Sequence, residues 1–296
     1  MPSPSSYYIS KNIFIIQVGK YNQKRKENGN NREAQTILVT FSLSHKTLSS
    51  WHPNSLHSNN TIVGGVDEAG RGSVLGPLVI AGVSIERKNL SRLRRAGVRD
   101  SKLLSAKARC QLFSQIIDLA EYICIFKSDC NEVDHYVFSK MLNKLEAKAM
   151  AAVIDNIYAM RVYVDACDVN STRYKECIEY ELAVGPKPKI FSFHHCDRTN
   201  TVVSAASIIA KVIRDGEIQK IRLLHKEIGS GYPCDRRTMR FIAEWISNHH
   251  SAPPFARKSW KPIRAILEKQ RQNIHLREVI KENVSLTITR TVGSMN

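Results

Sequence analysis

A short apolar run, residues 62–66, leads directly into two adjacent acids, Asp67 and Glu68, and then into the loop Gly70-Arg71-Gly72. The run has the length and the Ile and Val content of a buried strand. Consecutive strand residues point to opposite faces, so both acids can reach one centre only if the strand finishes there. We therefore predict a buried strand that ends at Val66, just before a pair of carboxylates.

Strands and helices alternate after this loop. The predicted strands are residues 78–85, 122–126 and 161–165, and the first of these forms a hairpin with residues 62–66. The predicted helices are residues 106–120, capped by Ser105, 143–158 and 204–214. This order predicts an α/β fold with a mixed β-sheet flanked by helices.

The patterning divides the chain into four segments. Residues 1–60 are rich in Ser and Asn and have no sustained periodicity beyond a possible strand at 36–41, so we expect a flexible extension. Residues 61–215 form the predicted α/β domain. Residues 216–269 form a small helical C-terminal subdomain, and residues 270–296 a tail.

The charge of the chain favours a polyanionic partner. The formal net charge is +17, of which residues 1–60 carry +5 and residues 261–296 carry +4, so +8 remains in the central body. A basic body of this kind is typical of proteins that bind nucleic acids. We expect no membrane association, because no apolar run is long enough for a signal peptide or a membrane helix.

The cysteines indicate a reducing environment. There are seven, an odd number, and they never occur as C-x-x-C. Neither a disulfide framework nor a zinc ribbon fits this pattern. We expect a soluble, cytoplasmic protein.

Four acids stand at predicted strand ends or in loops: Asp67, Glu68, Asp165 and Asp197. Any one of them could be an ordinary turn former or helix cap. A lone carboxylate next to the core, as Asp165 would be, is costly, whereas several that converge would be neutralised by a divalent cation. Oxygen ligands alone favour Mg²⁺ or Mn²⁺ over zinc, and the choice between these two ions stays open.

Six sequence elements occur in a characteristic order. They are G-V-D-E-A-G-R-G with V-L-G-P-L (65–72, 74–78), D-S-K (100–102), Y-V-D-A (163–166), H-H-C-D with V-V-S-A-A-S-I-I-A-K (194–197, 202–211), G-S-G-Y-P (229–233) and R-K-S-W (257–260). Together they resemble ribonuclease HII, the type 2 ribonuclease H, over about residues 61–264. The G-R-G loop argues against the type 3 enzymes, and residues 165–170 and 257–260 resemble the archaeal branch. Ser73, Cys196 and Pro262 depart from the family's usual Pro, Ala and Thr, but none replaces an expected metal ligand.

The resemblance implies a ribonuclease H-like fold and an endoribonuclease. It would hydrolyse the RNA strand of RNA–DNA hybrids and cut DNA at embedded ribonucleotides, leaving 5′-phosphate and 3′-hydroxyl ends. Two Mg²⁺ or Mn²⁺ ions would be held by the four acids. By resemblance, Asp67 would bridge the ions, Asp197 would help hold the ion that activates water, and Glu68 and Asp165 would serve the ion beside the leaving oxygen.

Further residues are candidates for substrate binding. Without Cβ atoms, the backbone of Gly70-Arg71-Gly72 can approach the ribose 2′-hydroxyl, the group that separates RNA from DNA. By resemblance, Tyr232 would lie against the sugar at the RNA–DNA junction. Lys102, Lys211 and Arg71 are candidate phosphate contacts.

Three other classes of protein compete with this interpretation: a non-catalytic hybrid-binding module, a transposase or integrase of the same superfold, and a structural basic protein. The first would have lost acids that are all present here, and the second does not suit the adjacent acids and the G-R-G loop. Failure to hydrolyse any hybrid would favour the third. We expect a monomer without a clear sliding-clamp motif, because residues 272–274 lack the aromatic pair of such a motif.

Overall fold

A computed structural model describes residues 13–27, 30–43, 61–99, 101–273 and 275, with the backbone alone for 15–27 and 30–43. The chain divides into two compact units, Met1–Arg71 with Pro77–Glu217, and Gly72–Gly76 with Ile218–Asn296. The described residues of the first unit form seven strands: β1 (Ile13–Glu27), β2 (Asn30–Leu43), β3 (Ile62–Ala69), β4 (Leu78–Glu86), β5 (Ala120–Ser128), β6 (Arg161–Asp165) and β7 (Lys189–Phe193). The α-helices of this unit, among its described residues, are α2 (Leu90–Ala96), α3 (Ala106–Leu119), α4 (Cys130–Phe138), α5 (Leu142–Ile154), α6 (Ser171–Glu181), α7 (Cys196–Thr199) and α8 (Thr201–Leu224) as far as Glu217. The remainder of α8 belongs to the second unit.

The sheet is mixed, as predicted. Its strand order is β2-β1-β5-β4-β3-β6-β7. β3, β4 and β5 pair antiparallel, whereas β3, β6 and β7 pair parallel. The parallel half brings the carboxyl ends of β3, β6 and β7 to one edge of the sheet.

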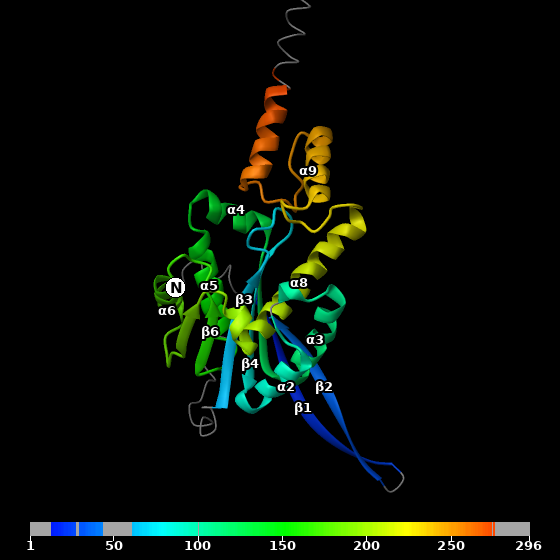
Figure 1. Cartoon of the computed structure of the whole chain (residues 1–296), viewed down its shortest axis with the longest axis vertical. Coiled ribbons are helices and arrows are strands. Elements are labelled where there is room, and N and C mark those ends of the chain that lie inside the picture. The colour runs from blue at the N-terminus through cyan, green and yellow to red at the C-terminus, as the bar shows by residue number, and fades with distance from the viewer. Residues whose placement is uncertain (1–12, 28–29, 44–60, 100, 274, 276–296) are drawn as a thin grey trace, which may run out of the picture. The chain divides into compact units, whose positions relative to one another are not determined.

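Helices cover both faces of this sheet (Figure 1). On one face, Val79, Ala81 and Val83 of β4 pack with apolar residues of α3 and α8. On the other face, Ile80 joins a second apolar cluster with residues of α5 and α6. The period-2 alternation along β4 thus separates two cores, as expected for a strand buried on both faces.

Residues 1–60 were expected to form a flexible extension, but two strands, β1 and β2, lie within them. β1 pairs antiparallel with β2, and its first residues pair with β5, from Ile13↔Phe126 to Gln17↔Tyr122. Ile13 is buried in the second core. The β-branched and aromatic residues at 13–16 suit a strand, and their pairing covers an edge of β5 that would otherwise be open. Residues 1–12 and 44–60 of the expected extension lie outside the described residues.

The predicted strand that ends at Val66 is too short. β3 continues through Asp67 and Glu68 to Ala69, because its pairing with β4 extends from Asp67↔Ala81 to Ala69↔Val79. The predicted helix at 204–214 is likewise part of the longer α8. The predicted N-cap is confirmed, since the Ser105 side chain accepts the backbone N–H of Ala108 at 3.2 Å.

The second unit is the small helical C-terminal subdomain that the sequence predicted. It contains α9 (Arg236–His249) and a helix at residues 261–273. Ile242, Ile246 and Ile263 form its core with Leu75 from the segment Gly72–Gly76. The sequence did not predict that the segment Gly72–Gly76 would belong to this unit, since Gly76 precedes Ile218 by 142 residues.

Candidate metal centre

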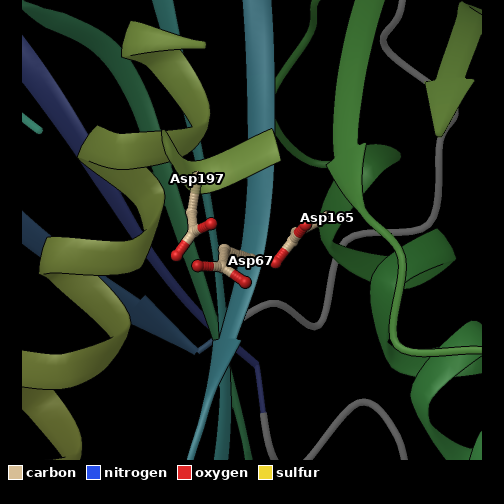
Figure 2. Close-up of side chains that lie close together, drawn as sticks. All are labelled: Asp67, Asp165 and Asp197. Atoms are coloured by element: carbon tan, nitrogen blue, oxygen red, sulfur yellow. The ribbon is translucent and has the colours of Figure 1, made fainter. Parts of the chain in front are cut away.

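Three aspartates converge in the first unit (Figure 2). Asp67, Asp165 and Asp197 each offer a carboxylate oxygen, and these oxygens lie within 4.8 Å of one another. Within the described parts of the chain, this is the only group of three or more His, Cys, Asp or Glu residues placed to hold a metal ion. The structure therefore brings together three of the four acids singled out from the sequence.

The parallel pairing of β3 and β6 explains why Asp67 and Asp165 meet. The pairing runs from Val63↔Arg161 to Val66↔Val164, and the two aspartates follow the last pair on their respective strands. Neighbouring parallel strands lie about 4.8 Å apart, so residues at matched positions are adjacent. One strand pairing thus brings together two aspartates that are 98 residues apart in the sequence.

Asp197 reaches the site from the turn after β7. It lies on the short helix α7, and His195 begins that helix in a left-handed conformation with φ of 56°. The backbone N–H of Cys196 donates to Oδ1 of Asp165 at 2.7 Å, and Ser204 donates its hydroxyl to the Asp197 carbonyl at 2.6 Å. These two bonds tie α7 to the end of β6 on one side and to α8 on the other.

Helix α8 rests against β3 just before Asp67. A Cβ on Gly65 would lie 2.4 Å from the carbonyl carbon of Val202, so this contact of backbone with backbone requires glycine. Ser207 of α8 hydrogen-bonds the Asp67 carboxyl, and its hydroxyl lies 2.9 Å from the hydroxyl of Ser101. Sequence reasoning did not select Ser101 or Ser207 as site residues, although Ser207 stands on the polar face of the predicted helix.

Burial raises the pKa values of these carboxyls. Burial, reinforced by the charge of Asp165, raises the pKa of Asp67 to about 7. The pKa of Asp165 is also raised, chiefly by burial and also by Asp197. Three ionised carboxylates at this spacing repel one another unless a cation neutralises them.

The donor set fits a hard divalent cation. Oδ1 of Asp197 is buried, and no hydrogen-bond partner for it exists among the described residues. All the converging donors are carboxylate oxygens, which favour Mg²⁺ or Mn²⁺. His194, His195 and the cysteines are outside this group, so the site differs from a zinc centre.

Glu68 lies on the opposite face of β3 from Asp67. The alternation of β3 directs it toward α5, where its charge interacts with Glu146 and with Arg71. Burial raises the pKa of Glu68 well above its ordinary value, and the neighbouring Asp67 raises it further. Its Oε2 is buried and has no hydrogen-bond partner in the described structure. Glu68 is close enough to interact with the aspartates, but it is not one of the three that converge.

The two candidate lysines differ in their surroundings. Lys102 is 69% exposed, and its Nζ lies 3.4 Å from Oδ2 of Asp197, at the rim of the metal centre. Arg109 donates to the carbonyls of Ser101 and Leu104, and so holds the turn that carries Lys102. Lys211 is mostly buried and pairs with Asp215 at 2.6 Å, and burial lowers its pKa.

The Gly-Arg-Gly loop has one glycine that the fold requires and one that it does not. Gly70 has φ of +87°, and a Cβ there would lie 2.8 Å from the carbonyl oxygen of Pro77. A Cβ on Gly72 would meet no described atom within 4 Å, and its φ is not in the left-handed region. Between them, Arg71 donates from Nε to Glu146 and from Nη2 to Asn143. The sequence did not point to Glu146 or Asn143, because nothing in the helix pattern separates them from other polar positions.

Tyr232 lies in the second unit, in a loop with defined hydrogen bonds. The N–H of Gly231 donates to Oγ1 of Thr238 at 3.0 Å, and the Gly231 carbonyl accepts the N–H of Val74 at 2.8 Å. Gly229 has φ of +67°. The N–H of Asp235 donates to the Tyr232 carbonyl at 3.1 Å, so the backbone is hydrogen-bonded both before and at Tyr232.

The cysteines and the length of the apolar helices can be compared with the sequence-based expectations. All seven cysteines lie in described residues and are free thiols. No helix within the described residues is long and apolar enough to cross a membrane.

Known proteins are similar to this chain in sequence and in fold. The family model of ribonuclease HII matches residues 64–263. The ribonuclease HII of Cenarchaeum symbiosum is 45% identical over 205 residues, which cover 69% of this chain and 98% of that protein. The crystal structure of ribonuclease H2 from Pyrococcus horikoshii OT3 has a TM-score of 0.66 at 40% identity, and covers 71% of this chain and 99% of that one. A PCNA:RNase HII complex from Archaeoglobus fulgidus has a TM-score of 0.61 at 34% identity, over 68% and 95% of the two chains.

The mixed sheet and the clustered carboxylates define a hydrolase of the ribonuclease H class. Within this class, the chain belongs to the ribonuclease HII family. The family resemblance predicted from six short elements is confirmed, and so is its archaeal character, since the similar proteins are mostly archaeal. Membership supports cleavage of the RNA strand in RNA–DNA hybrids.

Proposed function

We propose that the protein cuts the RNA strand of RNA–DNA hybrids and also cuts DNA duplexes at embedded ribonucleotides, with two divalent cations, leaving 5′-phosphate and 3′-hydroxyl ends. The proposal depends on one observation: three aspartates from separate elements offer oxygens within 4.8 Å of one another. Three carboxylates this close together are unfavourable, because of desolvation and mutual repulsion, unless a cation binds between them.

Asp67, Asp165 and Asp197 would hold the cations, and Glu68 would contribute from the other face of β3. When bound, Mg²⁺ or Mn²⁺ supplies charge stabilisation for the entering and leaving oxygens of an in-line displacement and activates water. Ser207 orients the Asp67 carboxyl, and the N–H of Cys196 orients that of Asp165. The exposed ammonium of Lys102 can contact a phosphate beside the centre.

Recognition of the ribose would use the backbone at Gly70-Arg71-Gly72. The open space beside Gly72 leaves room for a sugar to approach the chain, where a backbone amide or carbonyl can bond the 2′-hydroxyl. The ring and hydroxyl of Tyr232 would contact the sugar at the RNA–DNA junction. The net charge of +17 would supply the non-specific attraction for the duplex.

One relative, from Archaeoglobus fulgidus, was solved with PCNA. By that likeness we propose that a sliding clamp is a partner of this protein as well, although the sequence has no clear clamp motif at residues 272–274.

The decisive assay uses a DNA duplex that carries one ribonucleotide, with an all-DNA duplex of the same sequence as control. We expect cleavage of the first duplex alone, only with Mg²⁺ or Mn²⁺, and abolished by a chelator. End-labelling of the products should show a 3′-hydroxyl on one fragment and a 5′-phosphate on the other. Cleavage of a continuous hybrid but not of this duplex would refute the part of the proposal that concerns embedded ribonucleotides.

A further inference from the structure

Glu146 is a fully buried carboxylate outside the group of aspartates that forms the metal centre. It lies on α5, with its carboxylate against the guanidinium of Arg71: Nε lies 2.9 Å from Oε1 and 3.0 Å from Oε2. Cys167 donates its thiol to Oε2 at 2.9 Å. Burial lowers the pKa of Arg71, but the negative charge of Glu146 outweighs this effect and raises it, so the guanidinium stays charged.

Asn143 adds a second attachment for the same side chain. Nη2 of Arg71 donates to Oδ1 of Asn143 at 2.8 Å. Asn143 and Glu146 are three residues apart on α5, so they lie on the same side of the helix. The planar guanidinium is therefore held at two of its corners, which determines its orientation as well as its position.

The network continues past α5 into the segment after β6. Nδ2 of Asn143 donates to Oδ2 of Asp168 at 2.8 Å, and the buried Asp168 also pairs with Arg173. The backbone N–H of Asn170, with the side chains of Arg173 and Asn143, lowers the pKa of Asp168, so its acceptor oxygens stay ionised. Asn143 is thus itself oriented, with its oxygen left to face Arg71.

Stability alone does not account for such an arrangement. The Arg71 side chain is 37% exposed, but Glu146 is fully buried. Burial of a carboxylate costs hydration free energy that its attraction to a partner barely offsets, so an apolar residue of similar volume would serve stability as well. What a two-point attachment of Arg71 does provide is a defined position for its backbone. Arg71 stands between Gly70, whose conformation only glycine adopts readily, and Gly72, which has open space beside it.

We propose that Glu146 and Asn143 are positioning residues that fix the Gly70-Arg71-Gly72 loop for recognition of the ribose. Selection of a ribonucleotide over a deoxyribonucleotide then depends on helix α5, through Arg71. This inference rests on the proposed function, because it assumes that the loop contacts the 2′-hydroxyl.

The test compares two duplexes that differ only in the 2′ group at one nucleotide, either hydroxyl or fluorine. The measured quantity is the ratio of kcat/KM for the two duplexes. Glu146→Gln keeps the volume of the side chain and removes its charge, and Asn143→Ala removes the second attachment. We expect each variant to lower the ratio by roughly 10- to 100-fold, the size of effect that a small misplacement of a binding group produces. Mn²⁺ affinity and binding of an all-DNA duplex should remain as in the wild type.

Glu217→Gln is the matched control, since it removes a carboxylate from an ion pair of the same unit, with Lys127 at 3.1 Å, on helix α8. It should leave the ratio unchanged. Asn143 is only half-buried, so Asn143→Ala keeps the test decisive if Glu146→Gln does not fold. In the background of Arg71→Ala, either variant should have little further effect, because all three act through one side chain.

The two proposals fail in different ways. A wild-type protein that cleaves neither duplex refutes the proposed function, and this inference falls with it. A wild-type protein that discriminates, with folded Asn143→Ala and Glu146→Gln proteins that discriminate equally well, overturns this inference alone. A uniform loss on both duplexes also overturns it, because the ratio is then unchanged.

Discussion

Asp67 and Glu68 are consecutive residues of β3, and their side chains lie on opposite faces of the sheet. Asp67 meets Ser207 of α8, Asp165 and Asp197, whereas Glu68 faces Glu146 of α5 and Arg71. Because β3 does not end at Val66, the alternation of the strand applies to both acids. One strand therefore serves the metal centre on one face and the loop-positioning network on the other.

Replacement of Asp67 or Asp197 by Asn should abolish turnover almost completely. Each change keeps the side-chain volume but removes a charged ligand from the group of three. Binding of a hybrid should persist, because it depends on the basic surface rather than on these acids. Cleavage rates and gel-shift affinities measured on the same proteins check both parts. Asp118→Asn, at an exposed aspartate of α3, is the control, and a cleavage rate for Asp67→Asn equal to that of the control would contradict the site.

The metal-free protein should become less stable as the pH rises through about 7. Burial raises the pKa of Asp67 to about 7 in the folded state, so the folded protein favours the protonated carboxyl. Its contribution to stability is full below the ordinary pKa of an aspartate and is lost as the pH rises through the folded value. Saturating Mg²⁺ should reverse this loss, because the cation stabilises the ionised form. Urea unfolding at several pH values, with and without Mg²⁺, measures the effect, which should be much smaller in Asp67→Asn.

Activity should show the opposite dependence on pH. A divalent cation needs ionised ligands, so its affinity falls as Asp67 becomes protonated below about pH 7. The cation concentration that gives half-maximal cleavage should therefore increase as the medium becomes acidic. A half-maximal concentration that stays constant across this range would show that Asp67 is already ionised at low pH.

Two glycine replacements should separate folding from recognition. Gly65→Ala places a methyl group against the Val202 backbone and should destabilise the protein by about 1–3 kcal/mol or more. Gly72→Ala has space for its methyl group, and its free energy of unfolding should stay within about 0.5 kcal/mol of wild type. Its cleavage of a single ribonucleotide should nevertheless fall, because the methyl group occupies the space proposed for the sugar. Thermal unfolding and kinetics on both variants test this contrast, and full activity of Gly72→Ala would remove Gly72 from the site.

Two changes at Tyr232 should distinguish its ring from its hydroxyl. If the ring stacks on the sugar or base, Tyr232→Phe keeps most of the activity while Tyr232→Ala loses the equivalent of about 1–3 kcal/mol in kcat/KM. If the hydroxyl carries the contact, both variants lose activity to a similar extent. Wild-type rates for both variants on a duplex with a single ribonucleotide would exclude Tyr232 from substrate binding.

Removal of residues 1–58 should preserve catalysis but weaken the fold. The ribonuclease HII family model matches residues 64–263, so the catalytic elements lie after the deletion. The deletion also removes β1 together with its buried residue Ile13, and leaves β5, among the described strands, paired only with β4. We expect kcat within about tenfold of wild type, together with a lower midpoint of unfolding. Deletion of residues 1–12 is the control, and an unchanged midpoint for the longer deletion would show that β1 adds no stability.

Local signals account for much of what could be predicted. The apolar run before Asp67, the Ser105 cap and the alternation of strands and helices are properties of short segments, and each has its counterpart in the structure. The length of β3 was mispredicted because two acids look like a strand end, whereas pairing with β4 extends the strand through them. Likewise, β1 gains its place from pairing with β5, a contact more than a hundred residues away that no local pattern reveals.

By itself, the sequence determined the family and the mixed α/β fold, because six ordered elements and the periodicity of apolar residues are properties of the linear chain. It also predicted four candidate acids. Only the tertiary structure decided which acids meet. The parallel pairing of β3 with β6 joins Asp67 to Asp165, and the turn before α8 adds Asp197, while the alternation of β3 directs Glu68 toward Arg71 and Glu146. Strand register and helix packing determine which residues become neighbours. Both depend on contacts between distant parts of the chain, so the spacing of residues along the sequence does not predict them.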